Sequence, residues 1–353
     1  MNRLSRLFLL VTLLSCGITL SALEMKQGKV KLVMHENTGR FSAYYLTDVQ
    51  RNRYSAFFFD DDPRTSVFSV LVDNQVYRLG ESFEFTQTLE KTSNGAAFIW
   101  KSGFLEVRKE IYFATSTGQA LADGYGITVT LKNTSENSIN LGLRYLLDTY
   151  LGETDNTHFS TSSQSAFQNE TDYSGSFPEY WVSSPKSKTP LALQCMLKTP
   201  GVTIPDRVIM ANWKRLNDSS WNFESRSSRN FNLLPYSVND SAVGIYFNPV
   251  SLPSGETRTI NMVFGNFTEK GFSLAEKAEE ELSELYTKAV ISEMSSSDPV
   301  ESARTDLLTI KDLLSRIDVL ITSGKDIPQE QIDALANIVV SMEDRKKAHE
   351  ERK

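Results

Sequence analysis

A long series of short strand-like runs constrains this chain more than any other feature. Between residues 30 and 267, runs rich in Val, Ile, Thr, Phe and Tyr alternate with turns containing Gly, Asn, Asp and Pro. Such runs are typical of antiparallel β-structure, and the lack of helical segments between them argues against a parallel α/β sheet. The clearest predicted strands are Val67–Leu71, Ala97–Trp100, Leu105–Phe113, Gly126–Leu131, Val243–Phe247 and Thr257–Phe264.

Turn residues separate these runs at the expected places. Asp73-Asn74, Ser93-Asn94-Gly95 and the stretch 133–137 each stand between two predicted strands. The β region, residues 23–267, is larger than an immunoglobulin domain of about 100 residues. We therefore expect a mainly β chain, a large two-sheet antiparallel sandwich followed by a C-terminal helical hairpin.

After residue 267 the pattern changes to helical spacing, so residues 268–353 are predicted to form an α-helical assembly segment. Ser273-Leu274-Ala275-Glu276 is a capping box, and Asp298-Pro299 favours the start of a second helix. Gly324 ends that helix and Pro328 opens a third. Apolar residues at coiled-coil spacing then form a predicted assembly seam, which packs on itself, on the β region or on a partner. Its residues are Leu307, Ile310, Leu314, Ile317, Ile321, Ile332, Leu335 and Val339.

The N-terminus has the order of a secretory signal peptide, predicted for residues 1–22. Arg3 and Arg6 precede an apolar run, 7–14, that is too short to span a membrane. Cleavage near Ala22 is favoured, and the alternative is a lipobox in which Cys16 carries a lipid. We therefore expect an exported protein, periplasmic or associated with the cell surface, that contacts a membrane only if Cys16 is lipidated.

Charge and composition exclude several classes of function. The 353 residues contain 37 Lys and Arg against 44 Asp and Glu, a net charge of −7 without basic runs. A nucleic-acid partner is therefore not expected. Two cysteines and three scattered histidines supply neither a disulfide framework nor a Cys-based zinc site, and no cofactor is predicted. Cys195 lies in an alternating run, where a buried thiol is expected.

The densest polar stretch runs from residue 148 to residue 158. It contains Asp148, Glu153, Asp155 and His158 directly after a predicted strand. Carboxylates and an imidazole at a strand end are groups that hold calcium or act as an acid–base pair. The spacing does not match a calcium loop, and a turn stabilised by Asx hydrogen bonds explains the composition equally well. The stretch is therefore a candidate site with no assigned reaction.

Aromatic residues in the central third of the chain are a second candidate. Exposed rings at the rim of a β-sandwich stack on sugar faces, although core packing between sheets also requires rings. For carbohydrate binding, we expect Trp181 and Trp213 as stacking platforms, with Asp148, Glu153 and Asp206 as polar contacts.

Motifs in residues 120–267 resemble a domain found in uncharacterised exported bacterial proteins. Such domains are similar in strand pattern to the large sandwiches of the galactose-mutarotase-like class, which implies that architecture for the β region. Mutarotase-like enzymes need a His and a Glu on the concave face, and no such pair is evident here, so no catalytic role transfers. The matching motifs are 127–135, 141–152, 178–181, 205–208, Asn212-Trp213, Trp221, 240–243, 252–256 and Gly265.

Two functions from different classes remain open. The export signal and the heptad helices predict a non-enzymatic cell-envelope protein, whose sandwich displays loops. Its helices mediate self-association or bind an envelope protein partner. The alternative is a carbohydrate-binding module or a carbohydrate-active enzyme of the supersandwich type, with a glycan as ligand.

Overall fold

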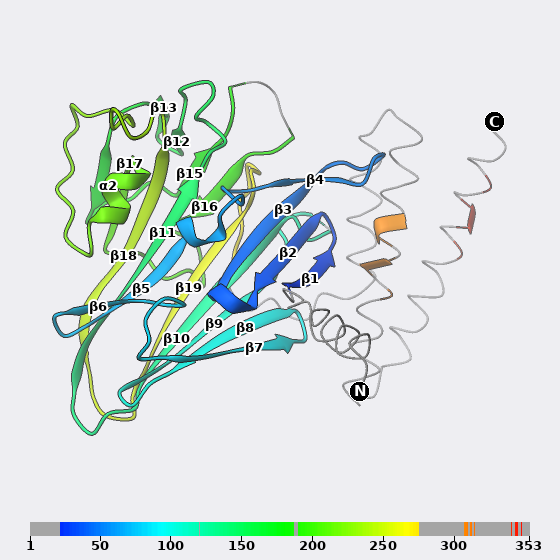
Figure 1. Ribbon diagram of the computed structural model, residues 1–353. Coiled ribbons are helices and arrows are strands. Elements are labelled where there is room, and N and C mark those ends of the chain that lie inside the picture. The colour runs from blue at the N-terminus through cyan, green and yellow to red at the C-terminus, as the bar shows by residue number, and fades with distance from the viewer. Residues whose placement is uncertain are drawn as a thin grey trace, which may run out of the picture.

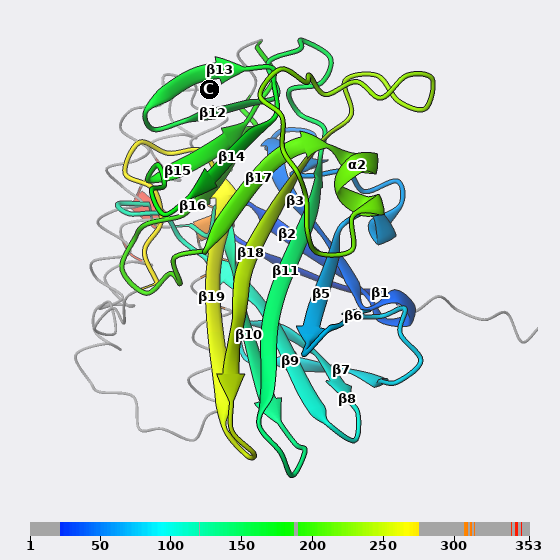
Figure 2. The same cartoon turned by 90° about the vertical axis from the view of Figure 1, so that its left-hand side faces the viewer.

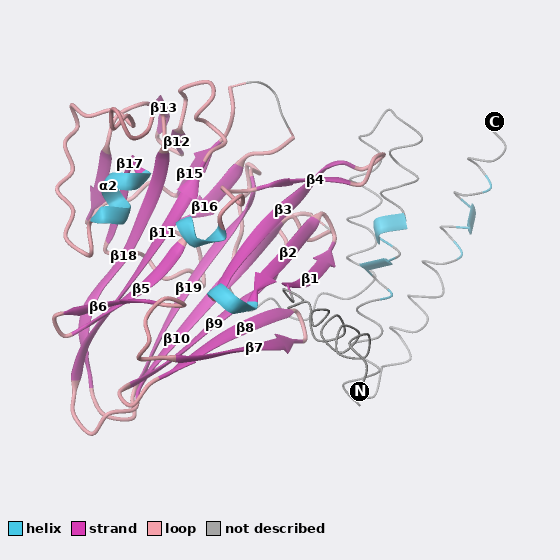
Figure 3. Ribbon diagram, viewed as in Figure 1, coloured by secondary structure: helices cyan, strands magenta, loops and turns pink. Residues whose placement is uncertain are grey.

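The computed structural model describes residues 22–119, 121–186 and 190–274, with isolated positions between 307 and 347. The predicted mainly β class is confirmed (Figures 1 and 3). The predicted two-sheet sandwich is corrected, because the described strands form three antiparallel sheets. Long strands of alternating burial, such as β9 (Leu105–Ala114), produce this arrangement because each presents one apolar face.

The four-stranded sheet lies at the N-terminal side of the sandwich and has the order β1-β2-β3-β4. Its strands are β1 (Ala22–Gln27), β2 (Val30–His35), β3 (Arg40–Asp48) and β4 (Arg53–Ala56). A short 3-10 helix, η1 (Glu36–Thr38), lies between β2 and β3, and a second, η2 (Pro63–Thr65), follows β4.

The nine-stranded sheet is the largest layer and has the order β13-β12-β15-β16-β19-β10-β9-β8-β7. Its first strands in sequence are β7 (Thr86–Thr92), β8 (Gly95–Lys101), β9 (Leu105–Ala114) and β10 (Gly124–Asn133). The others are β12 (Phe159–Thr161), β13 (Gln164–Phe167), β15 (Tyr180–Ser183), β16 (Leu193–Met196) and β19 (Thr257–Asn266).

The six-stranded sheet has the order β14-β17-β18-β11-β5-β6 and is seen face on in Figure 2. Its strands are β5 (Val67–Val72), β6 (Gln75–Arg78), β11 (Ile139–Thr149), β14 (Thr171–Ser174), β17 (Arg207–Asn212) and β18 (Ser241–Leu252). The predicted turn Asp73-Asn74 connects β5 and β6, where Asp73 has a left-handed backbone with φ 54°.

One core joins all three sheets. Phe41 on β3 packs edge-on against Tyr125 on β10, with ring centroids 5.7 Å apart. Tyr145 on β11 meets Phe264 on β19 at 6.0 Å. The four-stranded and six-stranded sheets therefore both pack their apolar faces against the nine-stranded sheet.

The short helix α2 (Trp213–Asp218) covers the outer face of the six-stranded sheet. Leu216 is buried there with Leu146 and Tyr246. The guanidinium of Arg144 donates to the carbonyl oxygens of Leu216 and Ser219, each at 2.5 Å. These contacts fix the helix at the end of the sheet where β17 ends.

The segment that follows β19 packs on the outer face of the nine-stranded sheet. Phe272 is buried against Met196 and Val263. Its ring lies over Gly124 and Gly265, where an added Cβ would come within 2.5 Å and 2.3 Å of ring carbons. These two glycines face each other in the β10–β19 ladder, so their missing side chains make room for the ring.

Several predictions fall mostly or wholly outside the described residues. They include the signal peptide, lipidation of Cys16 and the capping box, apart from Ser273 and Leu274. The helical hairpin is not shown. Of the assembly seam, only Leu307 and Leu314 are described, and both are helical and exposed. In the described part of the chain, no helix is long and apolar enough to cross a membrane.

Candidate functional site

Three strands of the six-stranded sheet bring polar groups together at one end. β11 ends at Thr149, β18 begins at Ser241 and β17 ends at Asn212, and ladder pairing places Ser241 between the other two. The hydroxyl of Thr149 donates to the Ser241 carbonyl oxygen at 2.8 Å. The polar stretch after β11 is thereby held beside the start of β18.

Glu153 is the central carboxylate of this end. Its Oε1 accepts hydrogen bonds from the backbone N–H of Ser241 at 2.8 Å and from the Ser241 hydroxyl at 3.3 Å. Partial burial raises the pKa of Glu153 to about 7. The backbone hydrogen bond from Ser241 opposes this rise, and the negative charge of Asp240 adds to it. A carboxyl group with this pKa exchanges a proton near neutral pH.

Two further carboxyl groups accompany Glu153. Asp148 is buried near the end of β11, and burial raises its pKa well above the usual range. A hydrogen bond with Thr65 opposes this rise, and the charges of Asp240 and Glu153 strengthen it. Burial also raises the pKa of Asp240, against a hydrogen bond from Ser237 and the charge of Arg215. The predicted residues Asp148 and Glu153 are therefore brought into one electrostatic group.

Trp213 joins this group from α2. Its backbone N–H donates to the Asp240 carbonyl oxygen at 3.2 Å, and its indole N–H donates to the Thr65 carbonyl oxygen at 2.9 Å. The ring is partly buried in the cluster that covers the six-stranded sheet. Of the two predicted stacking residues, Trp213 is the one located next to the carboxyl groups.

The other two predicted binding residues lie elsewhere. Trp181 on β15 is fully buried between the sheets, 6.0 Å from Phe159 and 6.5 Å from Phe264. It presents no face to a ligand at the surface, so its predicted role as a stacking platform is corrected. Asp206 accepts the backbone N–H of Asn248 at 2.7 Å, further along β18 from Ser241.

His158, the imidazole of the polar stretch, is a packing residue. It is buried, its ring lies 4.2 Å from that of Phe231, and its Nε2 lies 3.0 Å from Asn156 Oδ1. Burial lowers its pKa to about 4, so the ring is neutral at physiological pH. Among the described residues, no group of three or more His, Cys, Asp or Glu side chains could hold a metal ion.

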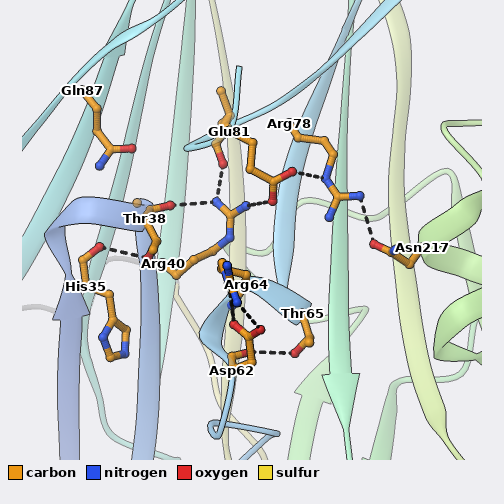
Figure 4. A network of polar contacts seen from close by, with 12 residues as sticks. His35, Thr38, Arg40, Asp62, Arg64, Thr65, Arg78, Glu81, Gln87 and Asn217 are labelled. Carbon is orange, nitrogen blue, oxygen red and sulfur yellow. Dashed lines mark hydrogen bonds and ion pairs between the residues drawn. The ribbon is translucent and has the colours of Figure 1, made fainter. Parts of the chain in front are cut away.

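A second polar region lies near the junction of the four-stranded and six-stranded sheets (Figure 4). The buried guanidinium of Arg40 reaches the carbonyl oxygens of Thr38 and Leu79 and pairs with Glu81 at 2.8 Å. Glu81 also pairs with Arg78 at 2.9 Å, and Arg78 donates to Asn217 at 3.0 Å. Burial lowers the pKa of Arg40 to about 10, against the charge of Glu81. These contacts connect β3, β6 and α2 and serve the fold.

Lys109 on β9 is enclosed near this region. Its ammonium group donates to the Gly39 carbonyl oxygen at 3.0 Å. Four rings surround it, with centroids 4.7 to 5.5 Å away: Phe41, Phe68, Phe98 and Trp100. Burial and the charge of Arg40 hold its pKa well below the ordinary value, and no carboxylate among the described residues pairs with it.

Sequence reasoning missed Asp240, Ser241 and Thr65 as members of the candidate site. Asp240 and Ser241 stand at the start of a predicted strand, which is a weak signal for a site. Only the pairing of β11 with β18 places them beside Glu153. The buried Cys195, by contrast, is free and lies in β16 as predicted.

Comparison with known proteins gives structural neighbours only. No protein-family model and no curated protein matches the sequence. A galactose mutarotase related enzyme from Lactobacillus acidophilus has a TM-score of 0.45 and 9% identity, over 73% of this chain and 100% of its own. A GalM/aldose epimerase homologue from C. elegans has a TM-score of 0.39 and 9% identity, over 70% of this chain and 100% of its own. An alpha-N-acetylgalactosaminidase from Bifidobacterium bifidum has a TM-score of 0.42 and 9% identity, over 80% of this chain but 41% of its own.

The first two of these neighbours are named as galactose mutarotase or aldose epimerase relatives, the class that the resemblance in strand pattern implied. They contradict the expectation of a non-enzymatic envelope protein, because those named above are related to enzymes of carbohydrate chemistry. At this identity, the likeness transfers no residue, substrate or reaction to this chain.

Proposed function

We propose that the protein is a carbohydrate-active enzyme in which Glu153 transfers the proton. The observation that carries this proposal is a partly buried carboxyl group with a pKa of about 7, fixed by two hydrogen bonds to Ser241. Reactions at the anomeric carbon of a sugar need a group that donates and accepts protons near the working pH.

The carboxyl groups beside Glu153 have different roles in this proposal. Asp148 is too buried to touch a substrate. The negative charge of Asp240 lies close to Glu153 and favours the protonated form of that side chain. Protonated Glu153 donates to the sugar oxygen whose bond to the anomeric carbon breaks, and the carboxylate that remains takes a proton back from the anomeric hydroxyl or from the attacking water. We assign Glu153 as the catalytic acid–base and Asp240 as a residue that acts through Glu153 by raising its pKa.

Activity on sugars tests this proposal. Purified protein is assayed for interconversion of aldose anomers and for hydrolysis of nitrophenyl glycosides. Glu153→Gln keeps the shape of the side chain but removes the titrating group, so turnover falls by about 100-fold or more. A plot of wild-type turnover against pH has a midpoint near 7, where Glu153 titrates. The residual turnover of Glu153→Gln shows no change at that pH.

The matched control is Asp206→Asn, which removes a carboxylate of the same β-sandwich away from the Glu153 cluster. Its turnover and pH profile remain those of the wild type. Equal rates for Glu153→Gln and the wild type, with both proteins folded, contradict the proposal.

A further inference from the structure

The connection between α2 and β18 carries three apolar side chains that remain in water. Leu234 is 74% exposed, Tyr236 72% and Val238 66%. All three lie on the turn that precedes Asp240, at the same end of the six-stranded sheet as α2 (Figure 2). Exposed apolar groups that gather on one turn mark a binding surface more often than scattered ones do.

The backbone of this turn is fixed. Leu233 and Ser237 exchange two backbone hydrogen bonds of 2.9 and 3.0 Å, and the N–H of Tyr236 donates to the Leu233 carbonyl oxygen at 2.7 Å. The side-chain oxygen of Asn232 accepts the N–H of Asn239 at 2.8 Å. These hydrogen bonds close the turn.

Hydrogen bonds from Asn212 and Arg215 hold the turn to the rest of the protein. The side-chain amide of Asn212 donates to the Phe231 carbonyl oxygen at 2.9 Å and lies 2.9 Å from the Ser237 hydroxyl. Arg215 donates to the carbonyl oxygen of Asn232 at 2.8 Å and pairs with the fully buried carboxylate of Glu170 at 2.7 Å. The polar side chains thus hold the turn to the protein, while its apolar side chains face solvent. Because the loop is already held, a ligand that binds it loses little free energy to ordering the loop.

We propose that this turn, residues 233–238, is a glycan-binding platform in which Tyr236 stacks on the apolar face of a sugar ring. The inference deepens the proposed function, because the platform leads directly into Asp240 and Ser241 beside Glu153. Asn230, Asn232, Ser237 and Asn239 stand in or beside the turn, and their amide and hydroxyl groups are of the kinds that hydrogen-bond sugar hydroxyls.

The size of the surface favours a glycan over a protein partner. A stable protein interface takes about 20 to 30 residues from each side. The three exposed side chains of the turn are far fewer than that. Lys214 Nζ lies over one face of the Tyr236 ring, 5.8 Å from its centroid, so the sugar stacks on the opposite face. The occupant is therefore an oligosaccharide or polysaccharide chain that extends from the Glu153 site.

Binding to soluble polysaccharides tests the platform. β-Glucan, xylan, mannan, galactan and α-glucan are each used as retarding polymers in affinity electrophoresis. Their oligosaccharides are then titrated by calorimetry. The wild type binds at least one of them, and Tyr236→Ala weakens that binding by about tenfold. Tyr236→Phe keeps the ring and retains the affinity.

Phe83→Ala is the matched control, because Phe83 is a fully exposed aromatic residue on the separate connection between β6 and β7. Its affinity equals that of the wild type. Circular dichroism checks the fold of each variant.

Three outcomes overturn the platform. They are wild-type affinity in Tyr236→Ala, no binding of any polymer by the wild type, and Tyr236-dependent binding to phosphatidylcholine vesicles in place of glycans. The two proposals fail separately. Tyr236-dependent glycan binding without Glu153-dependent turnover supports the platform and contradicts the enzyme, whereas Glu153-dependent turnover with unchanged binding in Tyr236→Ala does the reverse.

Discussion

Glu153 and Lys109 are both ionisable groups withdrawn from water, but their surroundings differ. Lys109 lies in the middle of the sandwich, enclosed by four rings and bonded to one carbonyl oxygen. Glu153 lies at a strand end, partly open to solvent and bonded to the start of a neighbouring strand. Burial disfavours the charged form in both places. Of the two, only Glu153 is placed where a substrate could reach it. Lys109 therefore serves packing, whereas Glu153 is a candidate for chemistry.

The opposite signs of these two groups predict opposite dependences of stability on pH. The largest effect is expected for Lys109, whose pKa is held well below its ordinary value of about 10.4. Between these two pKa values the unfolded chain binds more protons than the folded one, so the free energy of unfolding rises with pH. The slope approaches about 1.4 kcal/mol for each pH unit.

Lys109→Met removes this slope and packs a thioether among the four rings, where sulfur–aromatic contacts are favourable. Urea unfolding at several pH values measures the slope of the free energy of unfolding against pH. Lys101→Met, at an exposed position on neighbouring β8, retains the wild-type slope. If the free energy of unfolding depends on pH in the same way for wild type and Lys109→Met, the buried amine does not titrate. The contrast between Lys109 and Glu153 would then be wrong.

A smaller effect of opposite sign is expected at Glu153. Its pKa is raised from about 4.5 to about 7, so the folded state binds more protons between these values. Stability is therefore lost as pH rises through this window. Glu153→Gln is about 2 kcal/mol more stable than the wild type at pH 8, after allowance for solvent screening, and equal to it below pH 4.

Urea unfolding at pH 4 and pH 8 checks this prediction. Glu106→Gln, at a half-exposed site on β9, serves as the control and shows no such difference. Equal stability of Glu153→Gln and wild type at pH 8 would mean that the carboxyl group is ionised without cost in the folded protein.

The smallest effect concerns Asp240, whose charge contributes to the raised pKa of Glu153 after burial. Asp240→Asn removes that charge, so the pKa of Glu153 falls and the pH limb of turnover moves to lower pH. The pH profile of kcat/KM measures the shift. An unchanged limb in a folded Asp240→Asn variant would show that another group titrates in the assay.

Local patterns in the sequence predicted the strands well. β9 alternates between buried and half-buried residues along its whole length, and the predicted run Leu105–Phe113 differs from it by one residue. The turn at Asp73-Asn74 and the buried strand position of Cys195 were predicted for the same reason, because side-chain alternation and turn chemistry act over a few residues.

The candidate site was predicted in part. Asp148 and Glu153 stand together in the sequence, so their clustering after a strand was visible. Trp181 was misassigned because its strand continues a buried row across β16 and β19, and exposure is not encoded in residue type. Tyr236 was overlooked because its exposure comes from the fixed turn around it.

The sequence by itself determined the β class, most strand positions and the acidic stretch after β11, since each depends on neighbours along the chain. The tertiary structure alone decided that there are three sheets, that Ser241 meets Glu153 across 88 residues, and which aromatic rings face water. Ladder register and burial depend on contacts between distant segments. For this reason the same carboxylates and rings became a site only after the strands had paired.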